Sequence, residues 1–176
     1  MPNIKKLDAD FFHRDCLVVA PDLIGKILVH KLPDGTELRE RITETEAYRG
    51  EEDKACHASR GRTGRSEMLY RESGIIYVYI CYGVHHLMNV VTGEKEHPQG
   101  VLFRAGELHS GSGRLSKALQ ITKALNGQCL VNNPEIWVED DGFSCTWHTE
   151  KRVGIDYAGE IWKNKPWRWV MNPPKS

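Results

Sequence analysis

The segment Ile42-Thr43-Glu44-Thr45-Glu46-Ala47-Tyr48 decides how the rest of the chain folds around it. Its alternating character predicts a strand with Glu44 and Glu46 on one face and with the threonines and Ala47 on the other. Two carboxylates on one face of an internal strand are unusual, because charged side chains are rarely buried unless they are paired or functional. A solvated strand face is the simpler interpretation of this segment alone. The tyrosines and histidines later in the chain are what favour a chemical role.

Length and composition predict one domain over residues 1–176 in a cytoplasmic setting. The N-terminal residues do not resemble a signal peptide, and the longest apolar run, residues 75–82, is far shorter than a membrane span. The five cysteines are odd in number and never form a C-x-x-C pair, which indicates reduced thiols. The formal net charge is zero, so composition alone does not point to a polyanionic partner.

Turn and strand signals predict the fold class. A strand at residues 27–32 and the turn Pro33-Asp34-Gly35-Thr36 lead the chain back into the opening segment. Further strands are expected at 75–82, 86–92, 101–105, 135–138, 143–147 and 166–170. Helices are expected at 8–12, from Pro21 to near Gly25, at 66–71 with Ser66 as cap, and at 112–125. We therefore predict an α+β domain with a mostly antiparallel curved sheet, short helices and a protruding β-hairpin.

Three tyrosines lie on or just beyond the strand at 75–82. Tyr77 and Tyr79 share one face of this strand, where an aromatic cluster is most simply part of the core. Tyrosine rings also offer flat surfaces on which a nucleobase can stack. Tyr82 precedes Gly83 in a turn, and a ring at a hairpin tip could wedge between base pairs.

The sequence contains no complete motif for a metal site, a serine hydrolase or a phosphate-binding loop. The spacings of His57, His85 and His86 relative to the glutamates match no metal-binding motif, so we predict no metal site. The chain contains no G-x-S-x-G motif, and residues 111–114 lack the full phosphate-loop spacing, although they could anchor a phosphate at the start of a helix. We expect no cofactor.

Several motifs occur in a specific order along the chain. They are R-I-T-E-T-E-A-Y at 41–48, A-C-H at 55–57, Y-V-Y-I-C-Y-G-V-H at 77–85, M-N-V-V at 88–91 and V-L-F-R-A at 101–105. Residues 111–119, 152–155 and 158–159 extend the match over nearly the whole chain. This combination resembles the alkyladenine (3-methyladenine) DNA glycosylase family, of the type without a helix-hairpin-helix.

The resemblance implies a monofunctional N-glycosylase that starts base excision repair. Such an enzyme flips an alkylated, deaminated or etheno purine out of duplex DNA and hydrolyses its bond to deoxyribose, without a lyase step. By position, Glu46 would activate the attacking water, and Arg104 would hold backbone or water near it. A carboxylate suits this role because the sugar becomes oxocarbenium-like as the bond breaks. Glu44 is then left with a supporting or structural role.

The same resemblance assigns the residues that would hold the base. Tyr48, His57 and Tyr79 would form the stacking pocket, and the backbone amide of His57 would also read the base edge. Asn89 would exclude normal guanine by crowding its exocyclic amino group. Tyr82 would fill the place that the flipped base vacates. Stacked aromatic rings attract cationic bases such as 3-methyladenine. Neutral lesions would need protonation, for which the sequence names no residue.

The sequence departs from the family pattern in three places. Cys56 stands where the family usually has alanine, which puts the floor of the pocket beside His57 in question. Ser73 replaces a proline before Gly74, and the segment between Leu108 and Gly111 is short. None of these changes touches the residues assigned to catalysis or intercalation.

The implied partner is double-stranded DNA that contains damaged purines, bound by a monomer at the chromosome, with no membrane and no obligate protein partner. A non-catalytic nucleic-acid-binding module that uses the same tyrosines as a stacking platform is the main alternative. A carboxylate facing bound DNA is a liability for a pure binder, so Glu46 favours the enzyme. A metal-dependent hydrolase is a more distant alternative.

Overall fold

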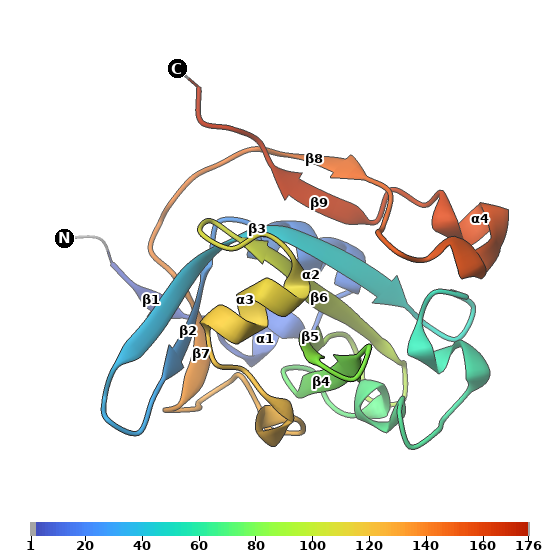
Figure 1. The fold of residues 1–176 in the computed structure, drawn as a ribbon, viewed down its shortest axis with the longest axis horizontal. Coiled ribbons are helices and arrows are strands. Elements are labelled where there is room, and N and C mark those ends of the chain that lie inside the picture. Colours follow the sequence, from blue (N-terminus) through green and yellow to red (C-terminus); the bar gives the residue numbers. More distant parts are fainter. Residues whose placement is uncertain (1–2, 176) are drawn as a thin grey trace.

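The computed structural model describes residues 3–175, which form strands, α-helices and short 3₁₀ helices (η) (Figure 1). In chain order they are β1 (Lys5–Lys6), α1 (Ala9–Phe12), α2 (Cys16–Leu23), β2 (Ile27–Lys31), β3 (Glu37–Arg49), η1 (His57–Arg60), η2 (Glu67–Tyr70), β4 (Ile76–Cys81), β5 (His85–Val91), β6 (Gln99–Gly106), α3 (Ser112–Ala118), η3 (Lys123–Leu125), β7 (Ile136–Asp140), β8 (Trp147–Glu150), η4 (Asp156–Ala158), α4 (Gly159–Lys163) and β9 (Arg168–Met171).

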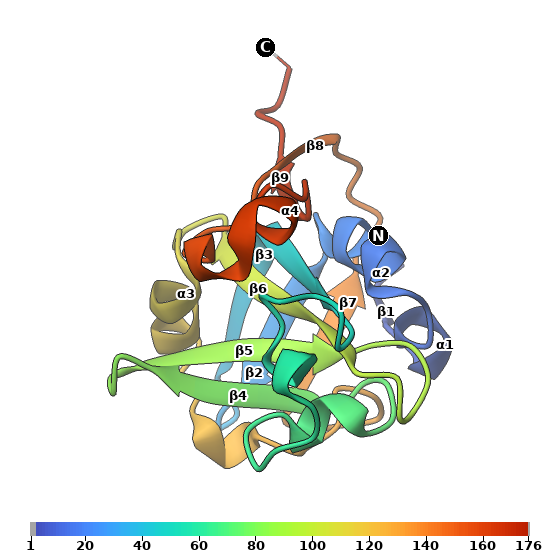
Figure 2. The ribbon, with the colours of Figure 1, turned by 90° about the vertical axis from the view of Figure 1, so that its right-hand side faces the viewer.

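The nine strands form one sheet whose main path is β1-β7-β2-β3-β6-β5-β4. The β8–β9 pair joins this path through β3, and all the strand pairings are antiparallel. In Figure 2 the β4–β5 hairpin extends beyond the body of the molecule. The prediction of an α+β fold with a mostly antiparallel sheet and a protruding hairpin is confirmed.

Strand β3 is the axis of this arrangement, because it is 13 residues long and changes partners along its length. Its first half pairs with β2, whereas its second half pairs with β6 and, over Glu44 to Glu46, also with β9. In and next to the part of β3 that is paired on both edges, Thr45, Glu46 and Ala47 are three consecutive buried residues. The register with β6 shifts on either side of Glu44, which is the signature of a β-bulge.

Short helices cover the two sides of the sheet (Figure 2). Helix α2 packs on β3 and β6, and α3 packs on β5 and β6. The main core lies between these elements and is built from buried apolar side chains that include Phe12, Leu23, Ile42, Met88, Phe103, Leu115 and Ile136. The longest helix in the described chain is α2, with eight residues, and no described helix has the length and apolar character needed to cross a bilayer.

Two helix predictions were wrong in their boundaries. Helix α2 begins at Cys16, where the Asp15 carboxylate accepts a hydrogen bond from the Leu17 N–H, so Pro21 lies inside the helix and not at its start. Pro21 has no N–H to donate to the carbonyl four residues earlier, and the helix ends two residues later, at Leu23. The helix expected at 112–125 ends at Ala118, because Gln120 adopts a left-handed conformation with φ 52°.

Two further local predictions were altered by side-chain hydrogen bonds. The strand expected at 143–147 begins only at Trp147, because the Asp141 carboxylate binds Arg41 and accepts a hydrogen bond from the Phe143 N–H, which holds the preceding segment as a loop. Ser66 precedes η2 without a side-chain capping bond, because its hydroxyl donates to the Gly61 carbonyl. Element type was predictable from local pattern, whereas these ends depend on specific side-chain hydrogen bonds, some local and one between Arg41 and the distant Asp141.

A fully buried ion pair fastens the C-terminal segment to the loop that follows β3. Arg152 donates to both carboxylate oxygens of Asp53 (2.6 and 3.0 Å), and both side chains have 0% exposure. Arg152 also donates to the carbonyls of Ala47 and Trp162. Asp53 accepts in turn from the backbone N–H groups of Arg49 and Ala55. Each charge is therefore paired and hydrogen-bonded, which is what makes its burial tolerable.

We expect Asp53→Asn to lower the free energy of unfolding by about 3–5 kcal/mol, because it leaves the guanidinium of Arg152 buried without its counter-charge. Urea unfolding followed by fluorescence measures this change. Asp22→Asn is the matched control, since the pair between Asp22 and Arg14 is largely exposed and should change stability by less than about 1 kcal/mol. Equal effects of the two substitutions would contradict the prediction.

Candidate active site

Glu46 is a buried carboxylate held by two hydrogen-bond donors, with an arginine close by. Its side chain is 1% exposed. The hydroxyl of Tyr48 donates to Oε1 (2.7 Å), and the backbone N–H of Val153 donates to Oε2 (2.8 Å). The Nε atom of Arg104 lies 3.6 Å from Oε2. Burial raises the pKa of Glu46, while these hydrogen bonds and the nearby arginines oppose the rise. The site therefore holds one oriented carboxylate that is more basic than an ordinary glutamate.

Arg104, on β6, completes the surroundings of this carboxylate. Its side chain is 22% exposed, yet its Nε atom is buried and has no hydrogen-bond partner among the described residues. Buried N–H groups are nearly always satisfied by protein or by ordered water. The Nε atom of Arg104, 3.6 Å from Oε2 of Glu46, is therefore a donor without an acceptor among the described residues.

The sheet register explains how residues far apart in the sequence reach one face. Glu46 lies opposite Leu102, Leu102 lies opposite Asn89, and Asn89 lies opposite Tyr77. Side chains that are directly opposite in antiparallel strands point to the same face. Tyr48 joins this face because it follows Glu46 by two residues. A row across β3, β6, β5 and β4 thus brings together the acid and several of the residues expected to hold the base.

His57, Tyr77 and Tyr79 form a compact aromatic cluster. The rings of His57 and Tyr79 have centroids 4.6 Å apart at 74°, and those of Tyr77 and Tyr79 are 5.4 Å apart. The hydroxyl of Tyr77 lies 2.8 Å from Nδ1 of His57. The cluster combines flat apolar faces with an oriented imidazole, which suits a planar ligand.

The imidazole of His57 is neutral near pH 7. Burial, assisted by the charge of Arg65, lowers the pKa of His57 to about 4. Burial also raises the pKa of Tyr77 to about 12, so its hydroxyl keeps its proton. We assign this hydroxyl as the donor to Nδ1 of His57, because no other acceptor for it is present in the described chain. The remaining nitrogen, Nε2, then carries the imidazole proton.

Asn89 is buried on β5, and its side-chain amide donates to the Tyr77 carbonyl (3.3 Å). This bond fixes the amide beside the aromatic cluster. Cys56, just before His57, is also buried, and burial raises the pKa of its thiol to about 12. A protonated, buried thiol behaves as a small apolar group. It therefore packs in the apolar cluster below the pocket without adding charge.

Tyr82 stands apart from this face, at the tip of the β4–β5 hairpin. Tyr82 and Gly83 have φ values of 51° and 73°, and the Val84 N–H donates to the Cys81 carbonyl (3.2 Å). Three residues, 82–84, connect the paired residues Cys81 and His85, and the two successive positive φ values with this hydrogen bond define a tight turn of type I′. A non-glycine residue there costs about 1–2 kcal/mol. The turn leaves the Tyr82 ring 91% exposed, which packing of the free protein does not explain.

Glu44 does not belong to this arrangement. Its carboxylate lies 3.4 Å from Arg168 of β9 and is partly exposed. The β-bulge beside Glu44 gives the two glutamates different surroundings, although both lie opposite residues of β9, Glu44 opposite Val170 and Glu46 opposite Arg168. In residues 3–175 no three His, Cys, Asp or Glu side chains gather as metal ligands would, so we assign no metal-binding role to either glutamate or to His57.

The sequence analysis missed several groups that shape the site. Val153 contacts Glu46 through its backbone N–H, so its side-chain type carries no signal. Asp53 and Arg152 lie 99 positions apart and meet only in the folded chain. Tyr77 was noticed as an aromatic residue, but its hydrogen bond to His57 depends on the loop that carries the histidine.

Comparison with known sequences assigns the chain to a family. The model of the family described as "Methylpurine-DNA glycosylase (MPG)" matches residues 10–111 and 106–175. A protein of Natranaerobius thermophilus named "Putative 3-methyladenine DNA glycosylase" is 44% identical over 190 positions, covering 94% of this chain and 95% of that protein. Proteins with the same name from Desulfitobacterium hafniense and Psychrobacter cryohalolentis are each 42% identical, covering 96% and 89% of this chain and 96% and 91% of their own lengths.

The matches cover almost the whole chain and the elements that build the site. The prediction of family membership is confirmed. The protein is a hydrolase that acts on DNA, and the chain belongs to the methylpurine-DNA glycosylase family.

Proposed function

We propose that this DNA glycosylase flips a damaged purine out of duplex DNA and hydrolyses its N-glycosidic bond with a water activated by Glu46. The observation that carries the proposal is the buried, oriented carboxylate of Glu46 on the sheet face that also carries Asn89 and Tyr77. A charge this deeply buried, with a raised pKa, is typical of a functional group.

The chemistry follows from the position of the acid. The bond between C1′ and N9 breaks with its electron pair on the departing purine, and the sugar develops oxocarbenium character. Ionised Glu46 stabilises this positive charge and takes a proton from the water that attacks C1′. Arg104 supports this step through its positive charge, because its Nε atom lies 3.6 Å from Oε2 of Glu46 and favours the ionised carboxylate.

The aromatic residues hold the extruded base. Tyr48, His57 and Tyr79 provide stacking surfaces, which favour cationic alkylated purines by cation–π attraction. The buried amide of Asn89 is fixed to the Tyr77 carbonyl and would clash with the exocyclic amino group of guanine. Tyr82 occupies the vacated place in the base stack, which accounts for its exposure at the hairpin tip.

We further propose that residues 1–176 act as one domain and as a monomer, since all the proposed site residues come from one chain. A non-catalytic binding module is the competing possibility. It would gain nothing from a buried carboxylate beside bound DNA, because burial of this charge is costly and its sign repels phosphates. We therefore favour the enzymatic role for Glu46.

Replacement of the proposed base gives the most direct test. We expect Glu46→Gln to abolish release of 3-methyladenine from methylated DNA while leaving binding to lesion DNA largely intact, because the amide keeps the shape but cannot take a proton. Single-turnover base release and gel-shift binding measure the two effects. Glu44→Gln, two residues away on the same strand, is the control and should remain active. Base release by Glu46→Gln at the wild-type rate would disprove the assignment.

The wedge role of Tyr82 predicts a dependence on how well the lesion is paired. We expect Tyr82→Ser to slow excision of a well-paired lesion by about tenfold or more, because the wedge offsets a few kcal/mol of unstacking. The same lesion opposite a mismatched base should be affected much less and serves as the internal control. Equal excision by the two proteins in both duplexes would show that Tyr82 does not intercalate.

The ionisation of Glu46 predicts how the rate of base release falls at low pH. The group must be ionised, and its pKa is raised, so the rate of base release should fall as the pH drops through a midpoint above that of an ordinary glutamate. Tyr48→Phe removes a hydrogen bond that lowers this pKa, so the midpoint should move to higher pH. The test is the single-turnover rate of release of a cationic lesion, measured from about pH 4 to about pH 8, a range that includes the ordinary pKa of glutamate. A midpoint at or below that of an ordinary glutamate would argue against Glu46.

A further inference from the structure

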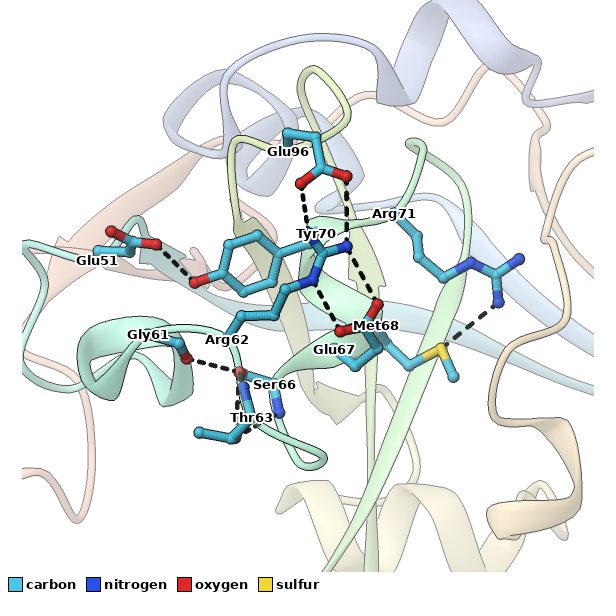
Figure 3. A network of polar contacts seen from close by, with 10 residues as sticks. All are labelled: Glu51, Gly61, Arg62, Thr63, Ser66, Glu67, Met68, Tyr70, Arg71 and Glu96. Atoms are coloured by element: carbon cyan, nitrogen blue, oxygen red, sulfur yellow. Dashed lines mark hydrogen bonds and ion pairs between the residues drawn. The ribbon is translucent and has the colours of Figure 1, made fainter.

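The loop between η1 and η2 is fixed by a clamp around Arg62 (Figure 3). Arg62 donates to Glu67 (2.8 and 3.1 Å) and to Glu96 (2.6 and 3.3 Å), and its guanidinium lies 4.8 Å from the centroid of the Tyr70 ring. The Tyr70 hydroxyl donates in turn to Glu51. The positive charge of Arg62 is thus fully engaged within the protein.

Ser66 closes the same loop from inside (Figure 3). It is buried, its hydroxyl donates to the Gly61 carbonyl (2.8 Å), and its Oγ accepts from the Thr63 N–H (2.8 Å). Residues 61–66 therefore have many internal restraints for an exposed loop. A loop held in this way presents the side chain at its tip in a defined place.

Arg65 is that side chain, and its charge is left available. It is exposed and has no carboxylate partner among residues 3–175, although Arg62 in the same loop has two. Its Cζ atom lies 5.4 Å from the centroid of the Tyr79 ring. The fold thus places an uncompensated cation at the edge of the aromatic cluster.

The charge of Arg65 reaches the polar groups of this cluster. It contributes to the lowered pKa of His57, and it opposes the rise in the pKa of Tyr77. A base stacked on the same rings would experience the same positive potential. Because His57 is neutral and Arg152, which lies over the Tyr48 ring, is paired with Asp53, Arg65 is the uncompensated cation that supplies this potential at Tyr79.

Neutral and cationic purines respond oppositely to such a charge. When the bond between C1′ and N9 of a neutral purine breaks, the electron pair leaves a negative charge on the base, which is later neutralised by a proton from solvent. An N7-alkylated guanine is already cationic and leaves as a neutral molecule. A fixed cation stabilises the first departure and repels the bound cation in the second. The effect strengthens once the base and the DNA exclude water from the pocket.

We propose that Arg65 is a specificity-determining residue that favours release of neutral damaged purines by stabilising the negative charge on the departing base. The inference rests on the proposed base pocket. Arg65 would be the activating group for neutral lesions, for which the sequence named no residue. This role requires no proton transfer from the protein, because the guanidinium stays charged throughout.

The test compares two lesions in the same duplex context. We expect Arg65→Gln to slow single-turnover release of hypoxanthine by about tenfold, less than the loss of a fully buried oxyanion donor because Arg65 is exposed. Release of 7-methylguanine should be unchanged or faster. Arg65→Lys keeps the charge and should restore most of the hypoxanthine activity.

Arg60→Gln is the matched control. Arg60 ends η1, is exposed, and contacts neither a carboxylate nor an aromatic ring in the described chain, so the ratio of the two rates should stay at the wild-type value. An equal loss on both lesions would identify Arg65 as a contact to the DNA backbone and overturn the proposal, as would a wild-type enzyme that releases only cationic purines. The ratio of hypoxanthine release to 7-methylguanine release depends on the leaving base and not on which group activates the water. An incorrect assignment of Glu46 would therefore appear in the Glu46→Gln experiment and would leave this ratio unaffected.

Discussion

The buried ion pair between Asp53 and Arg152 is the interaction on which the rest of the site depends. Arg152 binds the Ala47 carbonyl beside the proposed catalytic acid and directly precedes Val153, whose N–H orients Glu46. Asp53 holds the start of the loop that leads to His57. Two fully buried charges cannot separate without a large desolvation penalty. This one ion pair therefore holds the segment that carries Glu46 and the loop that carries His57 in a fixed position relative to each other.

The antiparallel register around β3 gives this anchored acid its surroundings. The row from Glu46 through Leu102 and Asn89 to Tyr77 spans four strands, so one sheet face carries groups from widely separated parts of the chain. Since a shift by one residue would turn every side chain to the other face, the β-bulge next to Glu44 matters. Residues on a sheet are also held more precisely than residues on loops, which suits the orientation of a water molecule that we propose for Glu46.

Electrostatics divides the site into two regions. Around Glu46, burial and a limited set of donors leave an ionisable carboxylate with a raised pKa. Around the aromatic rings, His57 is neutral and Arg62 is compensated by two glutamates, whereas Arg65 retains its charge. In the proposed mechanism, this negative charge lies where positive charge develops on the sugar, and this positive charge lies where negative charge can develop on the base. We propose that this separation lets one site act on lesions of different charge.

The sequence by itself determined the fold class, the strand that carries Glu46, the turn at Tyr82 and the family, because alternation, turn chemistry and motif order are local properties. Helix ends were harder to predict from the sequence. The helix that begins at Ser112 ends early because of the left-handed conformation of Gln120, and α2 begins at Cys16 because Asp15 caps it. Alternation placed two glutamates on one face, and the resemblance selected one of them. Only the tertiary structure paired Glu44 with Arg168 and buried Glu46, because strand pairing, backbone donors and buried ion pairs join residues that no sequence pattern connects.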